Sequence, residues 1–514
     1  MSHGLVTPGR NLKERAAVAV ADTELQGALR NLDIRLHTAR AVADRHGDLK
    51  DRAAAIRRET LADLDGWLDR LQATLEGLGA TVQRCATPEE ARRAVLDIAR
   101  REGVRRVVKA KSMATEEIDL SDALEAAGIE TVETDLGEYV VQVAGERPSH
   151  IITPVIHKTL RQVAAVLSRE AGEPLPADRD ALTEWVRRHL RRRFLAADMG
   201  ITGANFVAAD TGTIVVVTNE GNGRFCTSLP RVHVCVMPIE KVVPRFADLA
   251  TMLPLLTMSA TGQRLSNYLS MVTGPRRPGE PDGPEQLHVV FLDNRRRDLL
   301  GTPYEEMLAC IRCGACLNVC PVYRKVGGHA YDSVYSGPMG KVLTPLLSAG
   351  TDGRDLPHAS TLCGACTEAC PVEIPLADLL VRLRADLRTP GPVTGPDAGV
   401  PRASVIAPAA PHERLPGEGF PWPAADASLP TRPGPRGAVR RAGFATWARL
   451  WVSPSGYRVS TAVARAAGHL GSRQGWLRRA PAPLSGWTAS RDLPVPSGPP
   501  FRRRWRARGS RDGW

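Results

Sequence analysis

The sequence predicts a mixed α/β domain followed by a small, mainly α-helical domain built around cysteines. Between residues 80 and 292, short β-branched segments alternate with amphipathic ones, as in parallel strands joined by helices. Seven of the ten cysteines then lie in two short runs between Cys310 and Cys370. A chain of 514 residues is long enough to form two such cores or more.

The first predicted region, residues 1–79, is helical. Apolar residues recur at helical spacing through Ala16–Val42 and again from Ile56 to Leu71. Gly77 and Gly79 then mark the end of the helical pattern.

The α/β domain is predicted to span residues 80–292. Strands are expected at Ala80–Arg84, Val104–Ala110, Glu130–Thr134, Ile151–Ile156 and Arg231–Val243, with several buried strands in Ile201–Val217. Helices are expected at Pro88–Arg101, Asp119–Ala127 and Asp180–Phe194. Thr273–Gln286 has the Pro and Gly content of a turn-rich linker, and Val289–Leu292 is interpreted as a last strand.

The cysteine domain is predicted at residues 302–388 and closes with an apolar helix after Pro375. Its first run, Cys310–Pro321, reads C-x2-C-x2-C-x3-C-P, and its second, Cys363–Pro371, reads C-x2-C-x3-C-P. In ferredoxins with the first spacing, three thiolates hold one iron–sulfur cluster and the fourth holds the other. We therefore expect two [4Fe–4S] clusters. The first is assigned Cys310, Cys313, Cys316 and Cys370, and the second Cys320, Cys363 and Cys366.

The second run is one ligand short, because Ser360 stands where a full run has cysteine. The fourth position could be filled by Ser360, His358, solvent or a distant thiolate, or the cluster could contain three irons. Structural zinc also uses C-x2-C pairs, but it takes four ligands in each closed site. The three-then-one spacing and the two Cys-Pro endings favour iron.

The remaining cysteines, Cys85, Cys226 and Cys235, are interpreted as ordinary buried thiols, with Cys226 the one to test as a ligand. No GxGxxG motif follows a strand and no P-loop is present, so the sequence does not suggest a bound flavin or nicotinamide. Polar, glycine-rich loops in the α/β domain predict a ligand cleft at the strand ends. Its candidate residues are Lys111, Glu116, Glu133, Asp135, His150, Asn205, Glu220 and Asn222.

The last part of the chain is predicted as a Pro/Gly-rich linker at 389–440 and a basic, Trp/Arg-rich tail at 441–514. From Pro401 to Trp514 there are 19 Arg and 5 acidic residues, a balance of +14 within a total of +12. Such a tail can contact an acidic partner or an anionic membrane, or stay solvated. We expect no nucleic-acid partner, since no nucleic-acid-binding signature accompanies it. Without an apolar run of about 18 residues or a signal peptide, we expect a cytoplasmic, possibly membrane-associated protein.

Several ordered motifs resemble a known family. Lys111-Ser-Met with Glu116-Glu117, Glu133-Thr-Asp-Leu-Gly-Glu-Tyr139, Gly200-Ile-Thr-Gly-Ala-Asn-Phe206, Thr218-Asn-Glu-Gly-Asn222 and Ile239-Glu-Lys-Val-Val-Pro244 resemble the LUD domain. The cysteine runs, Ser360 included, and Trp487–Pro494 resemble the iron–sulfur subunit of the lactate-utilisation complex. The resemblance covers most of residues 60–390 and returns near the C-terminus.

This resemblance implies an α/β fold of the CoA-transferase/ribose-phosphate-isomerase type beside the ferredoxin-type domain. It implies a three-protein system that oxidises L-lactate to pyruvate, with this chain passing electrons to a quinone-linked acceptor. Three alternatives stay open: an electron carrier for another 2-hydroxy acid such as glycolate, a transferase-like enzyme with Glu220 as nucleophile, and a redox-sensing module.

Overall fold

The computed structural model describes residues 11–30, 32, 47–263, 266, 268–348, 350, 352–387 and short pieces between 446 and 494. It divides into two compact units, 1–407 and 408–514. The predicted linker 389–440 and most of the predicted tail lie outside the described residues. In the second unit the structure describes helix α20 (Pro454–Gly471) and a pairing of β11 (Trp476–Leu477) with β12 (Leu493–Pro494).

A six-stranded, fully parallel sheet forms the centre of the first unit, in the order β1-β10-β7-β4-β2-β3. Its strands are β1 (Thr81–Cys85), β2 (Arg106–Lys109), β3 (Glu130–Glu133), β4 (Met199–Thr202), β7 (Val232–Pro238) and β10 (Gln286–Leu292). β7 is buried along its whole length, in agreement with its apolar sequence, which His233 interrupts. The mixed α/β fold predicted for this region is therefore confirmed.

A second sheet contains four strands in the order β8-β5-β6-β9, and it was only partly predicted. They are β5 (Phe206–Ala208), β6 (Thr213–Thr218), β8 (Val242–Val243) and β9 (Tyr268–Val272). The expected single strand Arg231–Val243 is wrong, because the 3-10 turn η1 (Ile239–Lys241) interrupts it and leads the chain from the first sheet into the second. Thr273–Gln286 connects β9 to β10 within the α/β region.

Helices cover the sheets, and the predicted helices at 88–101, 119–127 and 180–194 correspond to three of them. The covering helices include α4 (Gly47–Ala62), α5 (Leu64–Gly77), α6 (Pro88–Arg101), α7 (Met113–Glu117), α8 (Leu120–Ala126), α9 (Leu136–Ala144), α10 (Leu160–Ala171), α11 (Arg179–Ala196), α12 (Asn222–Ser228) and α13 (Leu249–Thr261). α6 begins with Pro88 after the N-cap Thr87, whose side chain accepts from Glu90 N. Close packing of α12 requires Gly200 in β4, since a Cβ there would lie 1.8 Å from the Cys226 carbonyl oxygen.

The predicted strand at Ile151–Ile156 is wrong. This segment forms bends and turns, and the ring of His150 accepts hydrogen bonds at Nδ1 from Ile152 N (3.0 Å) and Thr153 N (3.2 Å). A side chain thus takes the backbone donors that a strand would give to a neighbouring strand. The apolar residues that suggested a strand pack instead toward the first cysteine run, where Ile152 lies close to Gly314.

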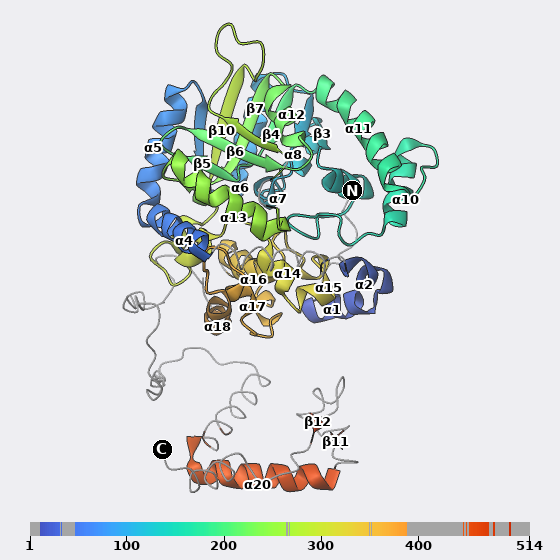
Figure 1. Ribbon diagram of the computed structural model, residues 1–514, viewed down its shortest axis with the longest axis vertical. Helices are drawn as coiled ribbons and strands as arrows, with labels where there is room; N and C mark the ends of the chain where they lie inside the picture. The colour runs from blue at the N-terminus through green and yellow to red at the C-terminus, as the bar shows by residue number, and fades with distance from the viewer. Residues whose placement is uncertain are drawn as a thin grey trace. The chain divides into compact units, whose positions relative to one another are not determined.

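The cysteine region consists of short helices on one side of the sheets (Figure 1). They are η4 (Glu305–Ala309), α14 (Ala315–Val319), α15 (Tyr323–Val326), η5 (His329–Tyr331), α16 (Gly337–Leu347), η6 (Leu356–His358), α17 (Ala365–Glu368) and α18 (Leu376–Asp386). Contact with the α/β region is close, because a Cβ on Gly328 would meet the Ser149 carbonyl at 1.7 Å. Tyr323 Oη also donates to that carbonyl at 2.7 Å.

The N-terminal helices α1 (Leu12–Ala21) and α2 (Thr23–Leu29) pack on the cysteine region, beside α15 (Figure 1). Leu12 N donates to Asp355 Oδ2 (2.8 Å), and Arg15 Nε donates to the Ala330 carbonyl (2.9 Å). The cysteine region therefore holds the N-terminal helices in place.

Candidate functional site

Four cysteines from both runs line one cavity. Cys310, Cys313 and Cys316 come from the first run and Cys370 from the second, around an empty volume of about 350 Å³. Three of the four residues are buried, and Cys310 is half-buried. The spacing argument assigned these same four residues to one cluster.

The other three cysteines line a second cavity of about 300 Å³. Cys320 comes from the end of the first run, and Cys363 and Cys366 come from the second. Ser360 lines this cavity as well. By contrast, His358 is exposed and does not line it. Cys85, Cys226 and Cys235 lie in β1, α12 and β7 of the α/β region, away from both cavities.

The two runs repeat the same backbone path, and Ser360 stands where Cys310 stands in the first. Two residues later the chain adopts a positive φ, at Arg312 (60°) and at Leu362 (55°). Gly314 (77°) and Gly364 (81°) follow two residues further on, each as the N-cap of a short helix, α14 or α17. Ser360 Oγ accepts a hydrogen bond from Leu362 N at 3.1 Å. The second run therefore keeps the loop of the first, with serine at the position of its first cysteine.

The sulfur atoms have the surroundings that iron–sulfur ligands need. Ile374 N donates to Cys370 Sγ (3.3 Å), and Tyr323 N and Lys341 Nζ donate to Cys320 Sγ (3.5 and 3.4 Å). Such donors stabilise the negative charge that thiolate ligands carry. Seven cysteines grouped as four and three around two cavities fit iron–sulfur ligation by donor chemistry, and the second group is one thiolate short of four.

A buried network of charges joins the first cysteine run to the α/β region. Glu240 Oε1 accepts from Arg312 Nη2 (2.8 Å), and Glu240 Oε2 lies 2.6 Å from Arg296 Nε. Arg296 also pairs with Glu117 at 2.7 Å. Arg57 of α4, 1% exposed, donates to the carbonyls of residues 240, 242 and 308, and so fixes the backbone on both sides of Lys241.

Beside this network lies a large open cleft of about 1510 Å³. Its walls include the loops after β2, β3, β4 and β7, together with the end of β6, helix α13 and residues Arg312 and Tyr335 of the cysteine region. The carboxyl ends of parallel strands are where α/β proteins bind ligands. The structure brings five of the eight predicted cleft residues here: Lys111, Asp135, Asn205, Glu220 and Asn222.

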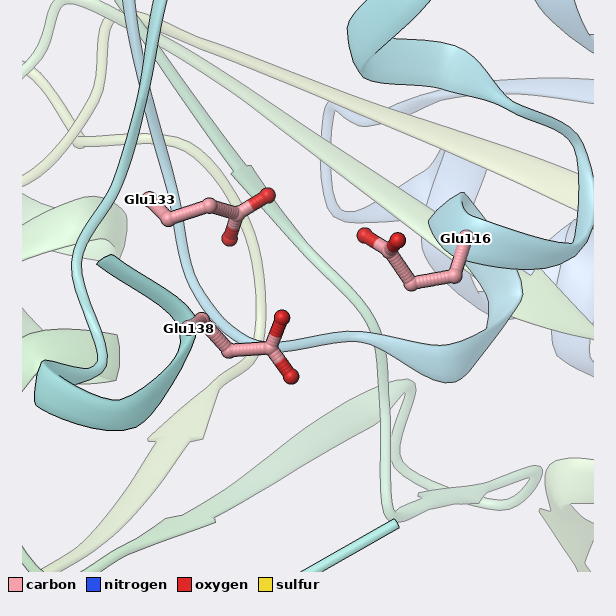
Figure 2. Close-up of side chains that lie close together, drawn as sticks. All are labelled: Glu116, Glu133 and Glu138. Atoms are coloured by element: carbon pink, nitrogen blue, oxygen red, sulfur yellow. The ribbon is translucent and has the colours of Figure 1, made fainter. Parts of the chain in front are cut away.

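Glu116 and Glu133 lie elsewhere, in a separate acidic pocket with Glu138. Figure 2 shows the three carboxylates facing one space, and their oxygens lie within 4.8 Å of one another. The ammonium of Lys109 lies 2.8 Å from Glu116 and 2.6 Å from Glu133. Burial raises the pKa of Glu133 to about 8, although the ammonium of Lys109 lowers it and so offsets part of the buried negative charge. His150 lines neither space and instead holds the loop after it.

Sequence reasoning missed two basic residues of the cleft, Lys241 and Arg312. Lys241 lies within the quoted motif Ile239–Pro244, but a single lysine in a mostly apolar segment gives no sign of its burial. Arg312 lies between two cysteines, where the metal-ligand spacing drew attention to the cysteines alone. Burial lowers the pKa of Lys241 to about 7, with Arg312 as the next largest cause.

Comparison with known proteins places three families on the chain. Residues 68–292 match the LUD domain, residues 306–374 the 4Fe-4S dicluster domain, and residues 425–510 the C-terminal domain of lactate utilisation protein B. In the described residues no helix is both long and apolar enough to cross a membrane.

Among similar proteins is lactate utilization protein B of Bacillus licheniformis, 39% identical over 498 residues and covering 96% of both chains. The same protein of Oceanobacillus iheyensis is 40% identical and covers 90% of this chain and 89% of its own length. An uncharacterized electron transport protein of Escherichia coli, YkgF, is 43% identical and covers 74% of this chain and 80% of its own. A solved DUF162 family structure from Deinococcus radiodurans covers 45% of this chain and 98% of its own, at 15% identity and a TM-score of 0.24.

Proposed function

Because the chain belongs to the lactate utilization protein B family, we propose that it carries electrons in the oxidation of L-lactate to pyruvate. The observation that supports this most is the grouping of seven cysteines, four around one cavity and three around another. When bound, iron–sulfur clusters supply one-electron transfer. The residues proposed to hold them are Cys310, Cys313, Cys316 and Cys370 for the first, and Cys320, Cys363 and Cys366 for the second.

Ser360 is proposed as the fourth ligand of the second centre. It lines the cavity from the position that Cys310 holds in the repeated loop. Solvent and a three-iron cluster remain the alternatives at this corner. The partner proteins of a three-protein complex, a quinone-linked acceptor and membrane contact through the basic tail belong to the same proposal.

Metal and sulfide analysis after anaerobic purification tests the proposal. We expect about seven to eight irons per chain, with acid-labile sulfide to match. Zinc without iron would contradict it. Cys370→Ser should remove the electron paramagnetic resonance (EPR) signal of the first centre although Cys370 lies in the second run. Cys366→Ser should remove the signal of the second centre, and loss of one and the same signal in both variants would show that the crossed assignment is wrong.

The choice of substrate needs a separate experiment, since the ligands would be the same for another 2-hydroxy acid. A deletion strain should lose growth on L-lactate and keep growth on glycolate. Loss on glycolate alone would favour the alternative carrier. EPR of the chain co-purified with its neighbours should show reduction of the centres when L-lactate is added.

A transferase-like role for Glu220 is a second candidate, because its carboxylate lines the cleft. Partial burial and, after it, Asp135 raise the pKa of Glu220 to about 7, and Leu136 N donates to Glu220 Oε2 at 3.0 Å. Acyl-CoA exchange that disappears in Glu220→Gln is the expected sign of this activity. A parent protein without exchange excludes it.

A further inference from the structure

We propose that the cleft at the carboxyl ends of the parallel strands binds a small carboxylate, with Lys241 as its counter-charge. This inference rests on the proposed function and names the ligand class of the α/β domain: a 2-hydroxy acid or the 2-oxo acid formed from it. It starts from the charge balance of the buried network between Arg57 and Arg312.

The network has more basic than acidic groups. Four cations, Arg57, Lys241, Arg296 and Arg312, are each at least nine-tenths buried. The acidic partners are Glu117 and Glu240, and both are already engaged by arginines. Arg57 has no carboxylate partner among the described residues, and its two Nη atoms donate to three carbonyl oxygens.

Lys241 differs from the other three cations in having neither a carboxylate nor a carbonyl partner among the described residues. Lys241 is only 7% exposed. In the described part of the chain, its ammonium forms no ion pair with a carboxylate and no hydrogen bond with a carbonyl. An unpaired buried charge is strongly destabilising, and proteins generally avoid one. An anionic ligand in the cleft that Lys241 lines would supply the missing partner.

The rest of the cleft suits a small polar acid. The hydroxyls of Thr153 and Thr218 are buried and lack a hydrogen-bond partner in the described part of the chain. Asn205 accepts from Val217 N through Oδ1, which directs its amide NH₂ group to other acceptors. One ammonium, two hydroxyls and an amide match a carboxylate with a neighbouring hydroxyl or carbonyl oxygen.

The position of the site also agrees with the ligand class. Arg312 lines the cleft on one side and the first cysteine cavity on the other. A carboxylate at Lys241 would therefore lie on the α/β side of Arg312, the residue between the cleft and the first cysteine cavity. Inorganic phosphate shares the anionic chemistry, so the test must separate it from carboxylates.

Calorimetric titration of the anaerobically purified full chain provides that test. We expect L-lactate and pyruvate to bind, and neutral lactamide and phosphate not to bind. Lys241→Met should weaken L-lactate binding at least tenfold. Lys241→Arg should retain most of it, and the exposed-site control Lys325→Met should leave it unchanged. Unchanged affinity in Lys241→Met, or binding of phosphate in place of lactate, overturns the proposal.

Two further readouts cover the remaining outcomes. If Lys241→Met does not fold, acetic anhydride labelling of the parent followed by peptide mass spectrometry should show that L-lactate protects Lys241 and not Lys325. Equal labelling with and without lactate contradicts the proposal. A Lys241→Met variant that changes only the redox potential of the first centre also overturns it, since the ammonium then serves the cysteines. Iron-loaded protein that binds no lactate refutes this inference alone, while iron-free protein refutes the proposed function.

Discussion

Lys341 donates a hydrogen bond to Cys320: its Nζ lies 3.4 Å from Sγ, and both residues are buried. The lysine comes from the middle of α16, and its ammonium also lies 5.5 Å from the centroid of the Tyr331 ring. A positive charge at this place favours the more negative, reduced state of whatever the Cys320 sulfur holds.

Lys341→Met should therefore lower the midpoint potential of the second centre. We expect a fall of about 60 mV, because a one-electron potential changes by that amount for each ~1.4 kcal/mol of lost stabilisation. An EPR-monitored redox titration measures it, with Lys325→Met as the exposed control. A shift confined to the first centre would show that Cys320 is assigned to the wrong cavity.

Ser360→Cys should convert the second centre to full cysteine ligation. The loop of Ser360 already repeats the path of the Cys310 loop, so the new thiol enters the cavity without a change of backbone. We expect iron content closer to eight per chain and slower loss of iron in air. Ser228→Cys, in the α/β region, controls for an added thiol. Equal iron loss in the parent and the Ser360→Cys protein would exclude residue 360 from the ligand set.

Arg57 and Arg58 form a matched pair for a stability test. Arg57→Ala should lower the free energy of unfolding by about 3 kcal/mol or more, because it leaves buried carbonyls without a donor. Arg58→Ala removes a pair between Arg58 and Glu373 whose side chains are 67% and 47% exposed, and such pairs contribute about 1 kcal/mol or less. Urea titration of both variants compares them. Similar losses in the two would mean that Arg57 does not hold the segment around Lys241.

His233 predicts a pH dependence of stability. Burial lowers its pKa from 6.5 to about 4, and the ring pairs with Thr202 Oγ1 at 2.8 Å. The unfolded chain takes up a proton as pH falls below 6.5, whereas the folded chain does so only near pH 4, so stability falls across this window.

The size of that effect follows from the pKa of 6.5 in the unfolded chain, which lies one pH unit above pH 5.5. Between pH 7.5 and 5.5, the parent should lose about 1.4 kcal/mol more than His233→Asn. Urea titrations at the two pH values measure the difference, and exposed His358→Asn is the control. A parent and a His233→Asn protein with parallel pH profiles would contradict a neutral, buried His233.

Local pattern was enough to predict much of the fold. The helix predicted at Pro88–Arg101 is confirmed by α6. Its N-cap, its first-turn proline and its apolar face all lie within one stretch of sequence, so a local pattern is enough to predict it. Ile151–Ile156 failed for the opposite reason. Its backbone donors are taken by His150, a local competition that apolar periodicity does not reveal.

The candidate site, too, was predicted from the sequence only in part. The cysteine spacing encodes the grouping of residues into two sets, since each set is fixed by short loops. Lys241, Arg57 and Arg312 come from three distant segments, and their common burial depends on tertiary packing. No spacing rule relates them, and only the folded chain shows that the ammonium of Lys241 has neither a carboxylate nor a carbonyl partner among the described residues.

The docking of α1 and α2 on the cysteine region sets an order of events during synthesis. The residues that receive Leu12 and Arg15, Asp355 and Ala330, are translated more than 300 residues later. The first helices leave the ribosome long before their binding surface exists, and they can settle only after the first cysteine run has been made. The N-terminal helices thus dock on residues that are made after the first cysteine run, Cys310–Pro321, and before the second, Cys363–Pro371.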